Sequence, residues 1–347
     1  MSKTLLLMAQ GKADRKVANE PVSGPAGQKL LPLHNAGKRR AQRMGLWLAR
    51  HAYVPDTILV SPAPRATLTA EKAIKVMGLG VERIHIDERL YRADFPALLE
   101  RLHALPEFAE TVLLVGHKQG LEQLIRYFTR DERVSGSNKQ QLLKPGSLAV
   151  LKLDEVKTDE TEPDVTWAKQ GACTATMCEL IHTSLLPDLF PWPNLNSSEL
   201  RKRPAYYYCQ SSVIPYRFNG QGLKILLIRS SKQSHWIVPK GIHEPGLSSQ
   251  ESAAKEAWEE AGIEGEVGAQ LLGSYRYEKW GSVCEVSVYP MRVESMVEED
   301  QWLESHRGRA WFSPEEAMGL LKQQSLIPML QQLVADLNRS TNIEAVA

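Results

Sequence analysis

The chain has 347 residues, of which 43% are hydrophobic and 24% are charged, so it is long enough for two globular domains. Its formal net charge of +1 provides no overall basic field for nucleic acid, so any anion-binding site must be local. The apolar run Leu5–Met8 is too short for a membrane span or a signal sequence, and we therefore expect a cytoplasmic protein without a membrane partner.

Strand-like and helix-like segments alternate through the first half of the chain. We expect strands at residues 4–8, 57–60, 82–86, 111–115 and 147–153, and a last strand near Trp167. Helical spacing of apolar residues predicts helices at 37–51, 65–76, 95–105 and 121–127. This alternation predicts a mostly parallel α/β sheet whose functional residues follow the carboxyl ends of the strands.

The composition changes where proline, asparagine and serine cluster after residue 186. We place a linker at residues 186–203, between an N-terminal domain of residues 1–185 and a C-terminal domain of residues 204–340. In the second domain we expect strands at 205–216, 223–229, 268–277 and 284–293, an acidic helix, and helices beginning at Pro314 and Ile327. A strand-rich unit with few helices predicts an α+β domain.

The cysteines follow no recognisable metal or disulfide pattern. Cys173, Cys178, Cys209 and Cys284 have neither the spacing of a zinc site nor that of a disulfide framework. This pattern favours a reducing, cytoplasmic setting.

The main candidate for a metal-binding site is a glycine-containing turn, residues 239–246, followed by a helix with three glutamates. Glu256, Glu259 and Glu260 are spaced i, i+3 and i+4, which places them on one face of the helix. Crowded carboxylates repel one another unless a cation lies among them, and oxygen ligands suit Mg²⁺ or Mn²⁺. Gly262 follows where a helix C-terminal glycine is expected. A solvated acidic helix is the alternative, which the preceding turn and the shared face disfavour.

The segment from Gly241 to Ile263 resembles the signature of the Nudix hydrolases. It departs at Leu247, where the family usually has a glutamate that Glu244 could replace, and at Lys255, which lacks the two-donor fork of the usual arginine. The resemblance implies an α/β/α Nudix fold and a phosphoanhydride hydrolase whose water is activated by a glutamate, with Glu256 or Glu260 as the base. The implied metal site comprises Gly241, Glu256, Glu259 and Glu260.

Residues 226–241 and 309–317 resemble the Nudix branch that hydrolyses diphosphoinositol polyphosphates and diadenosine polyphosphates. Such substrates need cations around the site, although each candidate could equally be ordinary surface charge. These candidates are Arg229, Lys232, Lys240, Arg276 and Lys279. A late acidic segment, with Glu304 as its first candidate, could add one more metal ligand or be a solvated loop.

Three short segments in the first half of the chain resemble the histidine phosphatase superfamily, in the branch of bacterial phosphohistidine phosphatases. They are residues 7–13, 61–71 and 115–121. The resemblance implies a three-layer α/β domain with a phosphate pocket that retains Arg65 and His117. Where the family has Arg-His-Gly, this chain has Ala9, Gln10 and Gly11, and a glutamine amide cannot replace an imidazole nucleophile. We therefore predict a pseudophosphatase, kept either for its fold or for residual phosphoanion binding.

Together these features predict a two-domain protein with one active, metal-dependent Nudix pyrophosphohydrolase. The expected substrates are dinucleoside polyphosphates or inositol pyrophosphates, then nucleoside di- and triphosphates. The alternative is a non-catalytic sensor in which both domains bind phosphorylated ligands. A third hypothesis, a phosphatase acting on the Nudix products, is disfavoured by Ala9 and Gln10. The sequence does not determine whether the chain forms a homo-oligomer.

Overall fold

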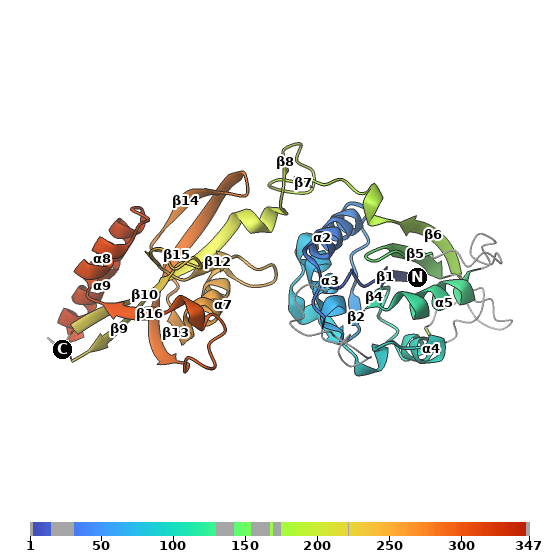
Figure 1. Ribbon diagram of the computed structural model, residues 1–347, viewed down its shortest axis with the longest axis horizontal. Coiled ribbons are helices and arrows are strands. Elements are labelled where there is room, and N and C mark those ends of the chain that lie inside the picture. Colours follow the sequence, from blue (N-terminus) through green and yellow to red (C-terminus); the bar gives the residue numbers. More distant parts are fainter. Residues whose placement is uncertain are drawn as a thin grey trace. The chain divides into compact units, whose positions relative to one another are not determined.

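The computed structural model describes residues 3–14, 31–129, 142–153, 167–168, 175–220 and 222–344. The chain divides into two compact units, Met1–Leu200 and Arg201–Ala347; their elements are labelled in Figure 1. Within the described ranges, no helix combines the length and the apolar character that crossing a membrane requires. The range predicted as a linker contains a short pairing of β7 (Phe190–Pro191) with β8 (Leu200–Arg201).

The first unit is built on one sheet, which has six strands in the part of the chain that the structure describes. Its order is β3 (Ile84–Ile86), β2 (Thr57–Val60), β4 (Thr111–Gly116), β1 (Thr4–Ala9), β5 (Leu148–Leu153) and β6 (Ala175–Ile181). The first four of these are parallel to one another, whereas β5 pairs antiparallel with β1 and β6 pairs antiparallel with β5. The predicted, mostly parallel α/β sheet is therefore present.

One strand of this sheet was predicted in the wrong place. Trp167 lies in a turn, where it is buried and its Nε1 donates a hydrogen bond of 2.7 Å to the Ala109 carbonyl. The last strand is β6, whose burial pattern is mixed rather than regularly alternating. Trp167 resembles a strand residue because it is apolar and fully buried, but it fills the core from a turn.

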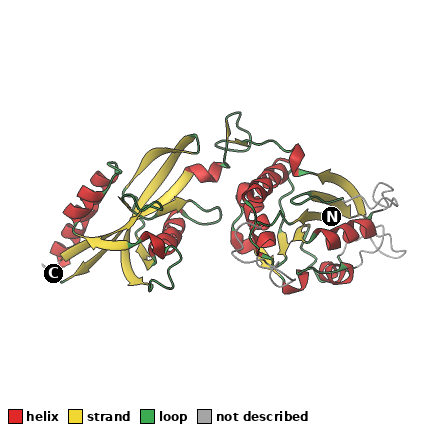
Figure 2. Cartoon of the chain, viewed as in Figure 1, coloured by secondary structure: helices red, strands yellow, loops and turns green. Residues whose placement is uncertain are grey.

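Helices cover both faces of the sheet (Figure 2). Helices α4 (Phe95–His103) and α5 (Lys118–Phe128) pack on the face that includes Leu5 and Leu7 of β1. Helices α2 (Asn35–Arg50) and α3 (Pro64–Ile74) pack on the opposite face with Leu6 and Met8. Because both faces are covered, the central strands are apolar on both sides, as is usual for parallel sheets. This is the predicted three-layer arrangement.

The second unit has a strongly bent, mainly antiparallel sheet, which has eight strands among the described residues. Its strands are β9 (Cys209–Asn219), β10 (Gly222–Arg229), β11 (Trp236–Ile237), β12 (Lys240–Ile242), β13 (Ile263–Val267), β14 (Gly273–Lys279), β15 (Ser282–Met296) and β16 (Arg309–Phe312). The long strands β9 and β15 pair in parallel at its centre. The sequence analysis did not predict the short strands β11, β12 and β16, which have only two to four residues, or β13, which follows directly on the acidic helix.

This sheet also lies between helices. The alanine stripe of α7 (Ser249–Ala261), formed by Ala253, Ala257 and Ala261, packs on one face. Helices α8 (Pro314–Leu320) and α9 (Leu326–Glu344) pack on the other face through residues such as Ala317 and Leu330. The predicted α/β/α sandwich is therefore confirmed. Glu256 and Glu260 lie beside this alanine stripe, where they meet strand β12.

Candidate functional site

The acidic helix α7 begins and ends at well-defined caps. The Ser248 side chain accepts a hydrogen bond of 3.1 Å from the Glu251 amide, and the Glu251 carboxylate accepts one of 2.7 Å from the Ser248 amide. This reciprocal pairing is a capping box, which satisfies two amides that the helix itself cannot. At the other end, Gly262 adopts a left-handed conformation with a φ of 59°, in agreement with the sequence prediction.

Two side chains from later in the chain hold the end of α7. Arg309 donates hydrogen bonds of 2.7 Å to the carbonyls of Ala261 and Gly262. Trp302 donates one of 3.2 Å to the Glu259 carbonyl, and the Arg309 guanidinium lies over its indole ring. These contacts satisfy carbonyls that a helix end leaves without partners. They fix where the last turn of α7, with Glu259 and Glu260, lies.

A cleft of about 660 Å³ opens beside α7 and the neighbouring strands. Glu256 and Glu260 line it together with Gly241 of β12, whereas Glu259 does not. Aromatic side chains and lysines are prominent among its lining residues. The aromatic residues are Trp236, Tyr275, Tyr277 and Trp280, and the lysines are Lys240, Lys279 and Lys322.

Glu256 lies directly against the backbone of Gly241. A Cβ added to Gly241 would overlap the Glu256 carboxyl group, so this close approach requires glycine. Burial, reinforced by the Glu260 and Glu259 carboxylates, raises the pKa of Glu256 to about 8. Glu244 adds to this effect, so its carboxylate also lies in the neighbourhood. Glu256 is thus a buried carboxyl group in a site where negative charge accumulates.

Glu260 is held from two sides. Its Oε2 accepts a hydrogen bond of 3.0 Å from the Lys240 amide, and its Oε1 accepts one of 2.7 Å from Nη2 of Arg307. Burial raises the pKa of Glu260, and these donors oppose that effect. Arg307 is itself buried and also donates to the Glu304 carboxylate. Glu260 is therefore fixed in one orientation.

Glu259 points elsewhere. Its Oε1 lies 2.8 Å from Nζ of Lys255, one helical turn earlier on α7. Within the described ranges, no group of three or more histidine, cysteine, aspartate or glutamate side chains is arranged to hold a metal ion. Glu256 and Glu260 share the cleft, and Glu259 is paired away from it.

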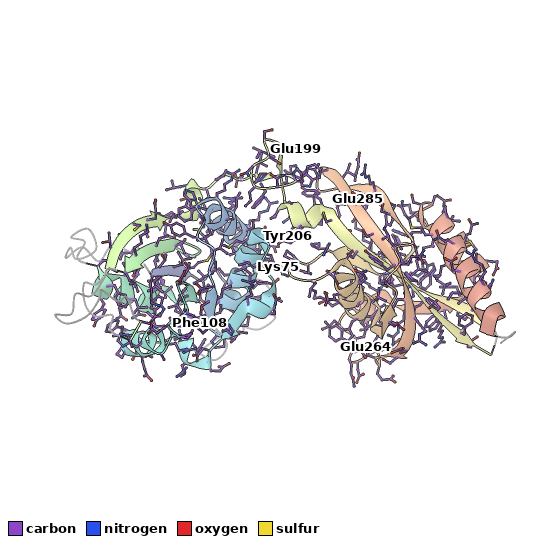
Figure 3. All side chains as sticks on the ribbon, turned by 180° about the vertical axis from the view of Figure 1, so that it is seen from behind. Lys75, Phe108, Glu199, Tyr206, Glu264 and Glu285 are labelled. Carbon is purple, nitrogen blue, oxygen red and sulfur yellow. The ribbon has the colours of Figure 1, made fainter. Side chains whose placement is uncertain are left out.

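Of the five cations proposed from the sequence, Lys240 and Lys279 line the cleft. Lys240 donates a hydrogen bond of 3.2 Å to the Tyr277 hydroxyl, and burial lowers the pKa of its ammonium. Arg276 instead pairs with Glu285, labelled in Figure 3, on the exposed face of the β14–β15 hairpin. Arg229 and Lys232 are not among the lining residues; the Arg229 guanidinium lies over the Trp236 ring.

The structure also brings in residues that the sequence did not single out. Arg307, Tyr277 and Trp280 line the cleft, and Gln210 accepts a hydrogen bond of 2.8 Å from the Tyr277 hydroxyl. No motif marked these residues, because each comes from a different strand or turn. The candidate late-loop ligand Glu304 is not a lining residue and pairs with Arg307 instead.

The first unit has a cleft of its own, of about 950 Å³, at the carboxyl ends of β1 and β4. It is lined by the predicted pocket residues Ala9, Gln10, Arg65 and His117, together with Arg92 and other residues from the loops. The parallel strands bring these separate sequence segments to one edge of the sheet, as expected for this class of fold.

Gln10 occupies the centre of this second cleft. The hydrogen-bonding network orients its amide oxygen toward Arg65 and His117. In that orientation the oxygen accepts hydrogen bonds of 3.0 and 3.1 Å from the Arg65 guanidinium and 2.9 Å from Nδ1 of His117. Burial, with Arg65 and Arg92 nearby, lowers the pKa of His117 to about 4, so its imidazole is neutral near pH 7.

Known proteins match the two units separately. A family model described as NUDIX domain matches residues 210–333. Diphosphoinositol polyphosphate phosphohydrolase 2 of Rattus norvegicus is 36% identical over 103 residues, which cover 28% of this chain and 55% of that protein. The chain thus spans about half the length of that relative. Nudix hydrolase 17, mitochondrial, of Arabidopsis thaliana is 32% identical over 139 residues, which cover 37% of this chain and 75% of that protein.

The first unit has a counterpart among solved structures. The protein histidine phosphatase SixA complexed with tungstate aligns with 52% of this chain and 97% of its own chain. The sequence identity is 18% and the TM-score is 0.39.

Proposed function

The chain belongs to the Nudix family of hydrolases, and we propose that its second unit is a metal-dependent pyrophosphohydrolase that cleaves phosphoanhydride bonds of small polyphosphorylated molecules. The observation that carries this proposal is the pair Glu256 and Glu260, which line one cleft beside Lys240 and Gly241. Carboxylates for a cation and lysines for phosphate are the two requirements of such chemistry.

The residues present suit Mg²⁺ or Mn²⁺. Their donors are carboxylate oxygens, and crowding and burial already raise the pKa of Glu256 to about 8, so a cation would relieve the repulsion. Glu256 and Glu260, joined by Glu259 after it leaves Lys255 and by the Gly241 carbonyl, would hold the ion. A bound divalent ion would screen the phosphate charge and acidify the attacking water.

Glu256 is the better candidate for the base that takes the proton from water. Both oxygens of Glu260 already accept hydrogen bonds, from the Lys240 amide and from Arg307, so Glu260 is suited to a fixed supporting role. Glu256 instead lies in the cleft against the Gly241 backbone, where a carboxylate can take a proton from water. This supports Glu256 over Glu260, the two alternatives that the sequence left open.

The substrates that we propose are dinucleoside polyphosphates or inositol pyrophosphates, followed by nucleoside di- and triphosphates. The rat relative, whose name describes a diphosphoinositol polyphosphate phosphohydrolase, supports a polyphosphorylated small molecule as the substrate. Lys240 and Lys279 at the cleft are suited to its phosphates. A cytoplasmic location stays a prediction from the sequence.

For the first unit we propose a pseudophosphatase. Gln10 sits between Arg65 and His117 at the place where the resemblance implies a nucleophilic histidine, and its amide oxygen takes up their hydrogen bonds. An amide in that place cannot accept a phosphoryl group. Metal-independent phosphatase activity that is lost in His117→Ala would contradict this proposal.

The decisive experiment is a substrate screen of the full chain with and without Mg²⁺. We expect Mg²⁺-dependent release of phosphate or nucleotide from polyphosphorylated substrates, and loss of that release in Glu256→Gln. Binding of such ligands without any turnover, in either condition, would instead support the non-catalytic sensor.

A further inference from the structure

The tip of the β14–β15 hairpin holds a tryptophan in a costly backbone conformation. Lys279 pairs with Ser282, so the turn between them consists of Trp280 and Gly281 alone. Both have positive φ angles, 55° and 73°. A two-residue turn of this kind favours asparagine, aspartate or glycine at its first position, and a bulky side chain there costs about 1–2 kcal/mol.

The indole of Trp280 reaches the candidate active-site cleft and is held there by other aromatic rings. It is one of the cleft's lining residues. Its ring centroid lies 5.2 Å from that of Tyr207 and 6.3 Å from that of Tyr208, both in T-shaped geometry. These contacts fix the ring, and neither tyrosine stacks flat on it. A strained residue held in a cleft by its neighbours points to a function for that side chain.

Trp280 differs from the other aromatic residues of the cleft. The Trp236 ring is covered by the Arg229 guanidinium, 4.2 Å from its centroid, and the Tyr277 ring by the buried Lys240 ammonium. The nearer cation over Trp280 is that of Lys279, at 4.4 Å, an exposed side chain at the hairpin tip; the Arg203 guanidinium lies farther from the ring, at 5.9 Å. An exposed lysine can move aside for a flat ligand and still bind its phosphates.

A chain of contacts links the region of Trp280 to the carboxylates of the cleft. Lys240 contacts both the acidic helix and strand β14: its amide donates a hydrogen bond to Glu260, and its ammonium donates one to the Tyr277 hydroxyl. Trp280 follows Tyr277 by three residues, just past the end of β14, or about 10 Å along an extended chain. A ribose and a short phosphate chain can bridge that separation, with the base at Trp280 and the phosphates near Glu256.

We propose that Trp280 is the platform on which a nucleobase stacks, so that the cleft selects nucleoside polyphosphates over inositol pyrophosphates. An inositol pyrophosphate has no flat aromatic face to stack on this ring. Stacking on an aromatic side chain does not depend on which base the ligand carries, because every base has a flat face. The proposal therefore covers both mono- and dinucleoside polyphosphates. It rests on the proposed hydrolase function of the same cleft.

The test compares kcat/KM of the full chain for three substrates: diadenosine tetraphosphate, inorganic tripolyphosphate, which has no base, and a diphosphoinositol polyphosphate. We expect wild type to prefer the dinucleotide to the inositol compound. In Trp280→Asn, a residue that suits the turn, we expect kcat/KM for the dinucleotide to fall about 5- to 150-fold more than that for tripolyphosphate, mainly through KM. Trp280→Phe should restore most of the selectivity.

Phe218→Asn is the matched control, because Phe218 is an exposed aromatic residue at the end of β9 and does not line the cleft. It should leave the ratio between substrates unchanged. An equal loss for the dinucleotide and tripolyphosphate in Trp280→Asn would make Trp280 merely structural and overturn the proposal, as would a wild-type preference for the inositol compound.

A second measurement separates this proposal from the proposed function. Calorimetry would measure the affinity of the full chain for ATP under conditions in which ATP is not hydrolysed. We expect this affinity to fall about 5- to 150-fold in Trp280→Asn and little in Trp280→Phe. If wild type hydrolyses none of the substrates, the hydrolase function fails while this binding difference still decides the role of Trp280. Unchanged ATP affinity in Trp280→Asn would overturn the nucleobase site.

Discussion

The Arg307 guanidinium donates a hydrogen bond of 2.7 Å to Glu260, although the two residues are 47 positions apart in the sequence. In the Nudix signature that this chain resembles, an arginine stands at position 255 and orients a neighbouring carboxylate. Here Lys255 pairs with Glu259 instead. Arg307, from the turn before β16, thus supplies the acidic helix with a planar guanidinium group, which a lysine cannot provide.

Arg307→Met should destabilise the second unit strongly. The change leaves the buried Glu260 carboxylate without its guanidinium, and breaking a buried pair costs about 3–5 kcal/mol of the free energy of unfolding. Urea unfolding would measure this. Arg292→Met is the control, because the ion pairs of Arg292 with Glu266 and Glu294 are exposed, and their loss should cost at most about 1 kcal/mol. Equal effects of the two variants would show that the Arg307–Glu260 pair contributes no more than a surface pair.

Gly241→Ala adds only one methyl group, but it should impair activity. The added Cβ overlaps the Glu256 carboxyl group, so the end of that side chain must move out of its place in the cleft. Steady-state kinetics and thermal unfolding would both register the change. Gly319→Ala is the matched control, because nothing lies within 4 Å of its added Cβ in helix α8. That variant should gain about 0.5–1 kcal/mol of stability and keep full activity.

Glu256→Gln and Glu259→Gln should impair the enzyme in different ways, the first through kcat and the second through metal affinity. If Glu256 is the base, its amide replacement lowers kcat about 10²- to 10⁴-fold, and added Mg²⁺ does not restore it. Glu259→Gln should instead weaken metal binding by roughly 10- to 100-fold, so that higher Mg²⁺ recovers much of kcat. Titration with Mn²⁺, followed by its paramagnetic resonance signal, measures that affinity without reference to turnover. Full recovery of Glu256→Gln by Mg²⁺ would rule out its role as the base.

His117 should make the stability of the first unit depend on pH. Its pKa is lowered to about 4 in the folded chain from an ordinary value of 6.5, mainly by burial and then by Arg65 and Arg92. Between these two values the unfolded chain binds the proton and the folded chain does not, so protons favour unfolding. The free energy of unfolding should therefore fall as pH falls from about 6.5 to about 4.

His117→Gln should reduce that pH dependence, since the variant has no imidazole to protonate. Urea unfolding of wild type and variant at about pH 7 and about pH 5 gives the comparison. The difference between the two proteins should be smaller at the lower pH than at the higher one. A difference that does not change with pH would mean that His117 titrates alike in the folded and unfolded chains.

The sequence alone determined the features that local spacing encodes. The i, i+3, i+4 glutamates, the glycine at 262 and the apolar runs of β1 and β4 each specify their own element, because helix and strand periods are properties of short segments. The two-domain prediction and the resemblance to Nudix hydrolases also came from contiguous residues. Trp167 and the short strands were misplaced or missed, because burial alone does not distinguish a turn from a strand.

Only the tertiary structure decided how the three glutamates divide their roles. Glu260 meets Arg307 and the Lys240 amide, Glu259 meets Lys255, and Glu256 lies against Gly241, although all three share one helical face. The same holds for Trp280, whose importance rests on a turn conformation and on a cleft built from several strands. Charge partners and cavities join residues that are distant along the chain, so no local pattern records them.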